Sequence, residues 1–424
     1  MKLTAKNTRS LSGTVNAPPS KSYTHRAVII GSLAGGESKI IDPLLSADTL
    51  ASINSCRAIG AGIEVRDNRL DIRGVGGEPT IPGDVIDVEN SGTTIRIMTA
   101  VSALCGGRVT LTGDESIQKR PMEPLLDALE QLGVETTSKN GKPPVSVSGP
   151  IKGGKCRIRG DISSQFISGL LIACPLAGND TGIELTTELK SKPYVGMTID
   201  TLEKFGAEID FSGNRFKVNG SQTYTPGEYV VEGDHSSAAF ILGAAALTDS
   251  EVTVKNLFGD SKQGDKKIVK ILEGMGCELE VGGDYVSVHG SSRLEGVEVD
   301  LSDSPDLVPI VSVLGALADG KTTIGGVEHV RYKECDRLSA MASELTKMGA
   351  NVDEFKDSLS ISGVRKLKGA NVGGWNDHRI VMALAVAGLR AEGETKISDA
   401  ETVKISFPDF VEVMQKLGAR VFQG

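Results

Sequence analysis

Polar residues that could bind and transform an anion stand at the start of an apolar helix near the beginning of the chain. Residues 18–36 read as a short turn, Ser20-Lys21-Ser22, followed by an apolar helix that stops at two glycines. A serine-rich turn at a helix start leaves backbone N–H groups and the positive end of the helix dipole available to an anion. Lys21 and Arg26 add fixed positive charge beside it. The stretch therefore predicts an anion-binding turn.

Similar turns, each followed by a helix of small residues, return at a constant spacing. They lie at residues 90–93, 163–165, 234–237, 303–306 and 376–379. Equivalent positions 22, 92, 164, 236, 306 and 378 are 70 to 72 residues apart. Six units at one period form an internal repeat, which determines the architecture before any local assignment.

The sequence of one repeat unit predicts the helices and strands that position these turns. In the first, we expect a helix after the turn, a strand at residues 37–41, a second helix at 49–59 and a hairpin formed by residues 63–65 and 70–72. Glycine follows the second helix in every unit, which is a helix-stop signal. The predicted unit is strand, helix, strand, helix, hairpin.

The sixth unit is incomplete, since only one hairpin strand follows Gly418. Residues 2–7 could supply its partner, so we expect residues 1–13 to pack with the C-terminal half. The predicted domains are residues 14–228 and residues 1–13 with 229–424, each holding three units, with a hinge at the two crossings. A continuous solenoid of six equal units is the alternative.

Two sets of polar residues emerge, one at first-helix starts and one in the loops before second helices, where Asp48 lies. A cleft lined by both would gather seven cations: Lys21, Arg26, Arg120, Lys333, Arg337, Arg379 and Lys404. In a chain of net charge −9, such local density predicts a small, multiply anionic ligand. Arginines bind carboxylate and phosphate bidentately, and Asp306 and Glu334 remain for acid–base chemistry.

Each of these residues also has a purely structural interpretation. The serines could be N-caps, Gly92 could relieve a tight turn, and Asp306 could cap its helix. Isolated cations are usually solvated surface charges. Recurrence at equivalent positions of the repeat favours the functional interpretation.

Composition narrows the class of protein. Apolar residues make up 39% and charged residues 24%, which is typical of a globular chain. Six scattered cysteines without Cys-x-x-Cys spacing indicate reduced thiols and no metal site. The negative charge argues against a nucleic-acid partner, and the apolar runs are too short for a bilayer. With no visible signal peptide, we expect a cytoplasmic protein.

Five motifs, in order along nearly the whole chain, resemble those of the 5-enolpyruvylshikimate-3-phosphate synthase family. They are Lys21-Ser22…His25-Arg26, Asn90-x-Gly92-Thr93, Ser163-Ser164-Gln165-Phe166, Lys333-Glu334-x-Asp336-Arg337-Leu338 and Asn376-Asp377-His378-Arg379. The resemblance implies an α/β fold of two similar domains, each of three repeated units, of the inverse α/β barrel type, with the active site between them.

The implied reaction moves the enolpyruvyl group of phosphoenolpyruvate to the 5-hydroxyl of shikimate 3-phosphate and releases phosphate. It is a step of the shikimate pathway to chorismate and the aromatic amino acids. The resemblance implies that no cofactor is needed. We expect the partners to be the two small-molecule substrates, with no metal, and we expect the protein to be a monomer.

The resemblance also implies roles for individual residues. Contacts to shikimate 3-phosphate would come from Ser22, Arg26, Ser163, Ser164, Ser191 and Lys333. Contacts to phosphoenolpyruvate would come from Gly92, Arg120, Arg337, Arg379 and Lys404. Lys21 and Gln165 would face both substrates, and Tyr194 would lie in the shikimate-phosphate pocket. Asp306 resembles the base for the 5-hydroxyl, and Glu334 and Lys21 are candidates for protonating the methylene carbon. His329 stands where the family pattern leads us to expect asparagine.

Two other functions are considered. Enolpyruvyl transfer to a UDP-amino sugar is expected to need a cysteine in the loop of residues 113–121, which here reads GDESIQKRP. A repeat scaffold that binds anions without turnover would leave Asp306 and Glu334 idle. The sequence favours the shikimate-type transferase.

Overall fold

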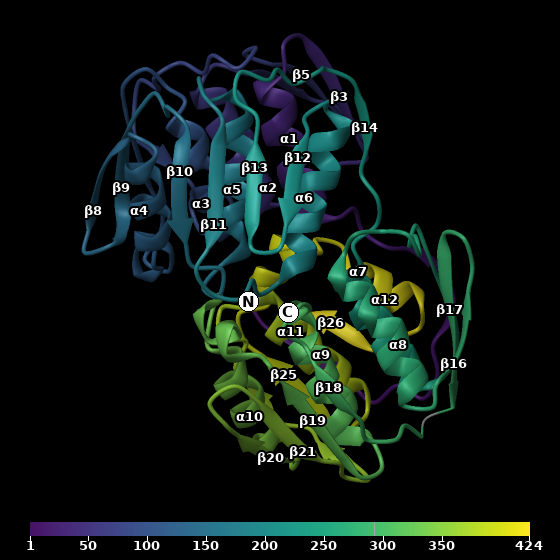
Figure 1. The fold of residues 1–424 in the computed structure, drawn as a ribbon. Coiled ribbons are helices and arrows are strands. Elements are labelled where there is room, and N and C mark those ends of the chain that lie inside the picture. The colour runs from purple at the N-terminus through teal and green to yellow at the C-terminus, as the bar shows by residue number, and fades with distance from the viewer. Residues whose placement is uncertain (292) are drawn as a thin grey trace. The chain divides into compact units, whose positions relative to one another are not determined.

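The computed structural model describes residues 1–291 and 293–424 (Figure 1). The chain forms two compact units. The first unit holds residues Pro19–Val231, and the second unit holds Met1–Pro18 with Glu232–Gly424. Within the described ranges, no helix has both the length and the apolar character needed to cross a membrane.

The first unit alternates strands and helices from its start. Its first elements are α1 (Lys21–Leu33), β3 (Glu37–Ile41), α2 (Ala47–Ala58), β4 (Gly62–Val65) and β5 (Arg69–Arg73). Next come β6 (Ile86–Asp87), α3 (Gly92–Ser102), β7 (Arg108–Thr112), the 3₁₀ helix η1 (Ile117–Lys119), α4 (Glu123–Gln131), β8 (Glu135–Lys139) and β9 (Lys142–Ser148). The last are β10 (Gly154–Ile158), α5 (Ser164–Ala173), η2 (Cys174–Leu176), β11 (Thr181–Leu185), α6 (Lys192–Lys204), β12 (Ile209–Ser212), β13 (Arg215–Val218) and β14 (Glu228–Val230).

The second unit begins with two N-terminal strands, β1 (Leu3–Lys6) and β2 (Ser12–Asn16). After the first unit come α7 (His235–Ala246), β15 (Asp249–Lys255), η3 (Gly264–Lys266), α8 (Lys267–Gly274), β16 (Glu278–Val281) and β17 (Tyr285–Ser291). They are followed by β18 (Glu298–Asp300), η4 (Pro305–Leu307), α9 (Val308–Leu317), β19 (Lys321–Gly325), η5 (Glu328–Tyr332), α10 (Arg337–Lys347), β20 (Asn351–Glu354) and β21 (Leu359–Ser362). The chain ends with β22 (Leu367–Lys368), β23 (Asn371–Val372), α11 (His378–Leu389), β24 (Ala391–Glu392), β25 (Glu394–Ile397), η6 (Ala400–Ile405), α12 (Phe410–Lys416) and β26 (Val421–Gln423).

One sheet topology recurs in both units. In the sheet β10-β11-β13-β12, β10 and β11 are parallel, and the hairpin β12–β13 adds two antiparallel strands (Figure 1). Elsewhere in the described chain the same order gives β14-β3-β5-β4, β6-β7-β9-β8, β2-β15-β17-β16, β18-β19-β21-β20 and β23-β25-β1-β26. The predicted α/β class is confirmed.

Three of these sheets take a strand from a distant part of the chain. β2 pairs in parallel with β15, and β14 pairs in parallel with β3. These pairings keep residues up to Pro18 in the second unit and residues up to Val231 in the first, a few residues beyond the bounds expected from the sequence. β1 pairs with both β25 and β26, as predicted for the incomplete last unit.

Two helices of the second unit, α7 and α11, are buried on every side. All twelve residues of α7 and of α11 are buried. A helix that is apolar and small all round is stable only when protein surrounds it. In the first unit, a small residue lets α5 approach α3 closely, because a Cβ at Gly169 of α5 would lie 3.1 Å from the carbonyl oxygen of Arg96 on α3. Each unit has its own hydrophobic core, unlike the continuous core of a solenoid.

Candidate active site

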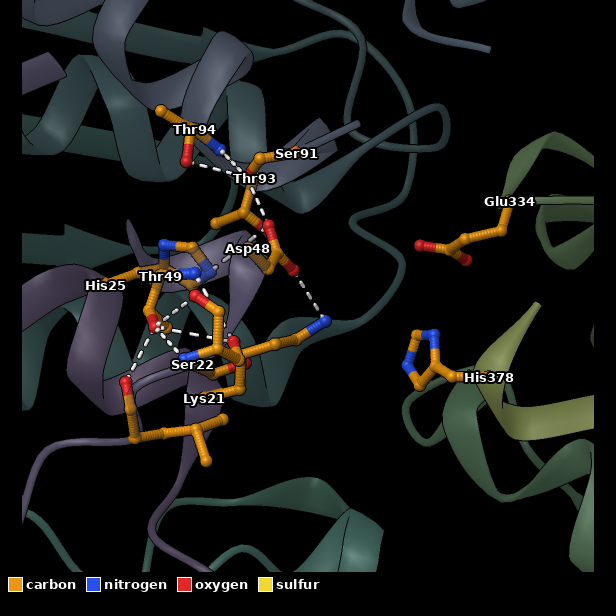
Figure 2. Close-up of polar contacts among 12 residues, drawn as sticks. Lys21, Ser22, His25, Asp48, Thr49, Ser91, Thr93, Thr94, Glu334 and His378 are labelled. Atoms are coloured by element: carbon orange, nitrogen blue, oxygen red, sulfur yellow. Dashed lines mark hydrogen bonds and ion pairs between the residues drawn. The ribbon is translucent and has the colours of Figure 1, made fainter. Parts of the chain in front are cut away.

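Lys21, in the first turn of α1, forms an ion pair with Asp48 on α2. The Lys21 ammonium lies 2.9 Å from Asp48 Oδ2, and their side chains are 11% and 7% exposed (Figure 2). Burial by itself would raise the pKa of the Asp48 carboxyl, but Lys21 and His25 together hold that pKa well below its ordinary value. Sequence reasoning placed Asp48 among the loop residues without giving it a role. Its pairing with Lys21 depends on how α1 and α2 pack.

Arg26 is buried beneath the same turn. It donates hydrogen bonds to its own helix α1 and to α5 and α6. Its Nε donates to Thr198 Oγ1 at 2.8 Å, Nη1 to the Ser22 carbonyl at 2.8 Å, and Nη2 to the Tyr194 carbonyl at 2.8 Å and to Ser168 Oγ at 3.3 Å. Burial lowers the pKa of the Arg26 guanidinium to about 10. Arg26 thus ties the starts of α1 and α6 to α5.

Gln165 connects the first turns of α5 and α3. It accepts from Arg96 Nη1 at 2.6 Å and donates to Thr93 Oγ1 at 2.9 Å. The Arg96 guanidinium also lies over the Phe166 ring, 5.5 Å from its centroid. Polar groups at the N-termini of α3 and α5 are therefore held side by side.

Arg120, just after η1, lies against Gly92 at the first position of α3. A Cβ built at Gly92 would lie 2.2 Å from Arg120 Nη1, so glycine is needed for this approach. Arg120 is 8% exposed. The arrangement brings a guanidinium to the N-terminus of a helix that already favours anions.

The serine and tyrosine residues predicted from the first unit are also at helix starts. Ser163 caps α5 by accepting from the Gln165 N–H, and Ser164 is its first residue. Ser191 precedes α6 with a left-handed backbone, φ 56°. Tyr194 lies in the first turn of α6 and is partly buried against the core. Figure 2 places Ser22 next to Lys21.

In the second unit, Arg337 at the start of α10 is the centre of a buried cluster. It donates to Asp306 at 2.6 Å, to Glu334 at 2.8 Å and to Asp377 at 2.7 Å. A second arginine, Arg379 of α11, lies 2.9 Å from the other oxygen of Asp306. Four of the residues predicted from sequence are therefore brought together here.

The pKa of the Asp306 carboxyl is strongly perturbed by this cluster. Burial alone would raise the pKa of its carboxyl, but Arg379, Lys333 and Arg337 outweigh burial and hold that pKa well below its ordinary value. Asp306 is therefore ionised, and each of its two carboxylate oxygens is paired with a guanidinium group. Burial, together with the Asp306 charge, raises the pKa of the nearby Asp265 carboxyl.

Asp377 makes two structural contacts, one within its own turn and one to another helix. Its Oδ1 accepts from the Arg379 N–H at 2.8 Å and caps α11. The same carboxylate holds Arg337 through Nε, although the two residues are 40 positions apart in the chain. No local pattern could reveal this contact.

Lys404 does not join the cluster through any contact that the structure describes. It is exposed on η6, which packs against α11. It makes no ion pair with any described residue. Across the described ranges, no group of His, Cys, Asp and Glu side chains could hold a metal ion.

Comparison with known proteins agrees with the motifs. Residues 5–414 match the family described as EPSP synthase (3-phosphoshikimate 1-carboxyvinyltransferase). The 3-phosphoshikimate 1-carboxyvinyltransferase of Methanocaldococcus jannaschii is 53% identical over 423 residues, covering 99% of each chain. That of Methanocella arvoryzae is 53% identical over 415 residues, covering 96% of this chain and 97% of the relative.

Solved structures agree with the sequence relatives. An EPSP synthase from Acinetobacter baumannii superposes with a TM-score of 0.83 at 27% identity and covers 100% of both chains. The family description and the names of these relatives favour the shikimate-type enzyme over transfer to a UDP-amino sugar. The chain belongs to the EPSP synthase (3-phosphoshikimate 1-carboxyvinyltransferase) family.

Proposed function

We propose that the protein carries out the reaction of its family with the two clusters described above. The enolpyruvyl group of phosphoenolpyruvate passes to the 5-hydroxyl of shikimate 3-phosphate, and phosphate leaves. The observation that carries the assignment of roles is Asp306, a buried carboxylate shared by Arg337 and Arg379. No metal or cofactor takes part.

Asp306 serves as the base that takes the proton of the 5-hydroxyl. With its pKa held low, it is ionised but a weak acceptor while two guanidinium groups hold its oxygens. Arg337 and Arg379 bind phosphoenolpyruvate in this proposal, and anionic groups of that substrate replace Asp306 as their partner. Asp306 then regains basicity when both substrates are present, which couples proton removal to substrate binding.

The remaining polar residues hold the two anionic substrates. Phosphoenolpyruvate is bound by Gly92, Arg120, Arg337, Arg379 and Lys404. Shikimate 3-phosphate is bound by Ser22, Arg26, Ser163, Ser164, Ser191 and Lys333, with Tyr194 in its pocket. Lys21 and Gln165 contact both substrates. Fixed cations and helix N-termini aimed at carboxylate and phosphate supply positioning and electrostatic stabilisation without reorganisation during the reaction.

The reaction needs an acid as well as a base. Glu334 or Lys21 donates a proton to the methylene carbon of phosphoenolpyruvate, and positive charge develops at C2. The 5-oxygen attacks C2 while its proton goes to Asp306, which gives a tetrahedral intermediate. Loss of phosphate and of one methyl proton then restores the double bond.

We further propose that the units correspond to two domains of the inverse α/β barrel type, each of three repeats. The first domain is then Pro19–Val231 and the second is Met1–Pro18 with Glu232–Gly424, close to the bounds expected from the sequence, residues 14–228 and residues 1–13 with 229–424, and hinges lie at the two crossings. Both domains contribute residues to one reaction. The protein works as a cytoplasmic monomer.

Release of inorganic phosphate from purified protein tests the function. We expect phosphate release only when shikimate 3-phosphate and phosphoenolpyruvate are both present. UDP-N-acetylglucosamine offered in place of shikimate 3-phosphate serves as the competing acceptor. Absence of turnover with tight binding of either substrate would support the non-catalytic scaffold instead.

A further inference from the structure

Five buried side chains form a closed ring around the carboxylate that holds Lys21. They belong to α1, α2 and the N-terminal turn of α3, and all five residues are buried: His25, Asp48, Ser52, Ser91 and Thr94. Figure 2 labels four of them, His25, Asp48, Ser91 and Thr94. The ring contacts run from His25 Nδ1 to Ser52 Oγ at 2.8 Å, from Ser52 Oγ to Thr94 Oγ1 at 2.7 Å, and from Thr94 Oγ1 to Ser91 Oγ at 2.6 Å. The Ser91 hydroxyl then donates to Asp48.

The ring closes on a longer fifth contact, because His25 Nε2 lies 3.5 Å from Asp48 Oδ1. The numbers of contacts and protons do not match. Each hydroxyl carries one proton, a neutral imidazole carries one and an ionised carboxylate carries none. Four protons must therefore serve five contacts, and burial leaves little access for water to supply another.

The distances show which contact lacks its proton. Three of the other contacts have ordinary hydrogen-bond length and the Ser91–Asp48 contact is shorter still, whereas His25 Nε2 has no hydrogen-bond partner in the described part of the chain. The Ser91 hydroxyl lies within hydrogen-bonding reach of both Asp48 and Thr94 but carries only one proton. Because the Asp48 carboxylate can only accept, whereas the Thr94 hydroxyl can also donate, the Ser91 proton goes to Asp48; Thr94 then donates to Ser91, and Ser52 donates to Thr94. His25 then donates from Nδ1 to Ser52, and its Nε2 lone pair faces Asp48.

The charged groups that face His25 are Asp48 on α2 and Lys21 and Arg26 on its own helix. Burial lowers the pKa of the His25 imidazole; Asp48 opposes this, and Lys21 and Arg26 add to it. A neutral ring is the state that fits both the charges and the distances.

We infer that His25, Ser52, Thr94 and Ser91 are positioning residues for the reaction. The ring binds Asp48 Oδ1, so that Oδ2 is turned toward Lys21, and it does so with His25 as the neutral Nδ1–H tautomer. This inference rests on the substrate-binding and proton-donor role proposed for Lys21. It assigns to His25 a function that acts through Asp48 and not through contact with substrate.

Breaking the ring should reverse the tautomer. In Thr94→Val, three contacts remain for three protons, so His25 Nε2–H can donate to Asp48 while Ser52 donates to Nδ1. In Ser52→Ala, three contacts again remain, and Nε2–H again donates to Asp48. Both substitutions are close in volume to the residue removed.

Histidine labelled with ¹⁵N and ¹³C distinguishes the tautomers by NMR in the full-length protein without substrates, at neutral pH. We expect Nδ1–H for His25 in the wild type and Nε2–H in Thr94→Val and Ser52→Ala. Thr99→Val is the matched control, since Thr99 is a buried threonine of the same helix that donates to the Ile95 carbonyl and lies outside the ring. It should keep Nδ1–H.

Kinetics then test the positioning role. Thr94→Val should lower kcat about three- to tenfold relative to Thr99→Val, the effect of one lost hydrogen bond. Nε2–H in the wild type, or one tautomer in all four proteins, would overturn the inference. A reversed tautomer with unchanged kcat would also overturn it. Failure of the wild type to release phosphate would refute the proposed function alone and leave the tautomer result standing.

Discussion

Arg337 shows what one residue contributes to this protein. Its guanidinium is 1% exposed and contacts three carboxylates, those of Asp306, Glu334 and Asp377. A buried charge is tolerated only when it is paired and hydrogen-bonded, and removing one partner is strongly destabilising. Together the three carboxylates raise the pKa of Arg337 well above its ordinary value, against the effect of burial. Each of the three carboxylates therefore helps to hold this buried charge in place.

Asp306→Asn tests the base. The change keeps the shape and removes the proton acceptor, so we expect kcat to fall at least about a hundredfold, as for loss of a general base. Steady-state phosphate release is the measurement, with Asp353→Asn on the exposed strand β20 as the control. Near-normal kcat in purified Asp306→Asn would remove the residue from this role.

The stability difference between wild type and the same variant should depend on pH. Because the folded-state pKa of Asp306 lies below its unfolded value of 3.8, ionised Asp306 stabilises the folded protein above that pH. The contribution is lost as pH falls through the folded-state pKa. Urea unfolding should show wild type more stable than Asp306→Asn at neutral pH, with the difference shrinking below about pH 4. A difference that is constant with pH would contradict the charge pairing.

Gly92→Ala tests the approach of Arg120. The new Cβ would lie 2.2 Å from Arg120 Nη1, so the guanidinium must move away from the start of α3. We expect KM for phosphoenolpyruvate to rise about ten- to a hundredfold, as for a lost hydrogen bond to a charged group, with a smaller effect on KM for shikimate 3-phosphate. Gly106→Ala is the control, because a Cβ there meets nothing within 4 Å. Equal changes in both KM values would count against the assignment.

At the scale of elements, the turn that leads into α11 is unusual. Trp375 and Asn376 both have left-handed backbones, with φ of 56° and 52°. Such conformations are unfavourable for residues other than glycine and persist only when neighbours hold them. Glu344 of α10 does so, accepting from Trp375 Nε1 at 2.8 Å and from the Gly373 N–H at 2.9 Å. The turn leads directly to the residue that caps α11.

Glu344→Gln tests this support. The amide keeps the shape but weakens the charge-assisted hydrogen bonds, so we expect the free energy of unfolding to fall by about 1–3 kcal/mol. Denaturant unfolding measures the loss. Lys347→Gln, which removes only the half-exposed ion-pair partner of Glu344, should cost less than about 1 kcal/mol. Equal losses in the two variants would show that the turn does not depend on Glu344.

The sequence predicts where helices and strands lie better than it predicts which strands pair with one another. The strand expected at residues 37–41 is β3, and the helix expected at 49–59 is α2, because glycine signals and apolar spacing act locally. The sequence did not predict that β2 would join a sheet of the second unit or that β14 would join a sheet of the first. Strands of three to five residues carry no pattern that identifies a partner more than 180 residues away.

The same limit applies to the candidate site. Turns at helix starts revealed Lys21, Gly92 and Asp306, since each turn has a local sequence signal. The pairing of Asp48 with Lys21 and of Asp377 with Arg337 joins helices through space. Those contacts follow from packing angles that no single-sequence pattern records.

At the scale of the whole molecule, the proposed ligands of each substrate come from both units. Shikimate 3-phosphate is assigned Ser22 and Arg26 from the first unit and Lys333 from the second. A ligand favours the conformations to which it binds more tightly. Saturating shikimate 3-phosphate should therefore lower the radius of gyration in small-angle scattering, and phosphoenolpyruvate alone should bind weakly.

Lys333→Ala provides the control for compaction, because it removes a second-unit contact and should reduce the change in radius. Calorimetry gives the affinity for phosphoenolpyruvate. An unchanged radius with shikimate 3-phosphate, together with tight binding of phosphoenolpyruvate to the free protein, would refute ordered binding.

The pairing of β1 with β26 has a consequence for how the chain could be reconnected. Lys2 and Gly424 exchange backbone hydrogen bonds of 3.1 and 3.0 Å, so the two ends are neighbours in one sheet. A circular permutant that joins them and opens between residues 18 and 19 would run through residues 19–231, 232–424 and 1–18. Each unit would then be one uninterrupted segment, and the chain would pass between them once instead of twice. The permutant would turn an interleaved protein into two modules in series, which could be cut apart and expressed as separate polypeptides.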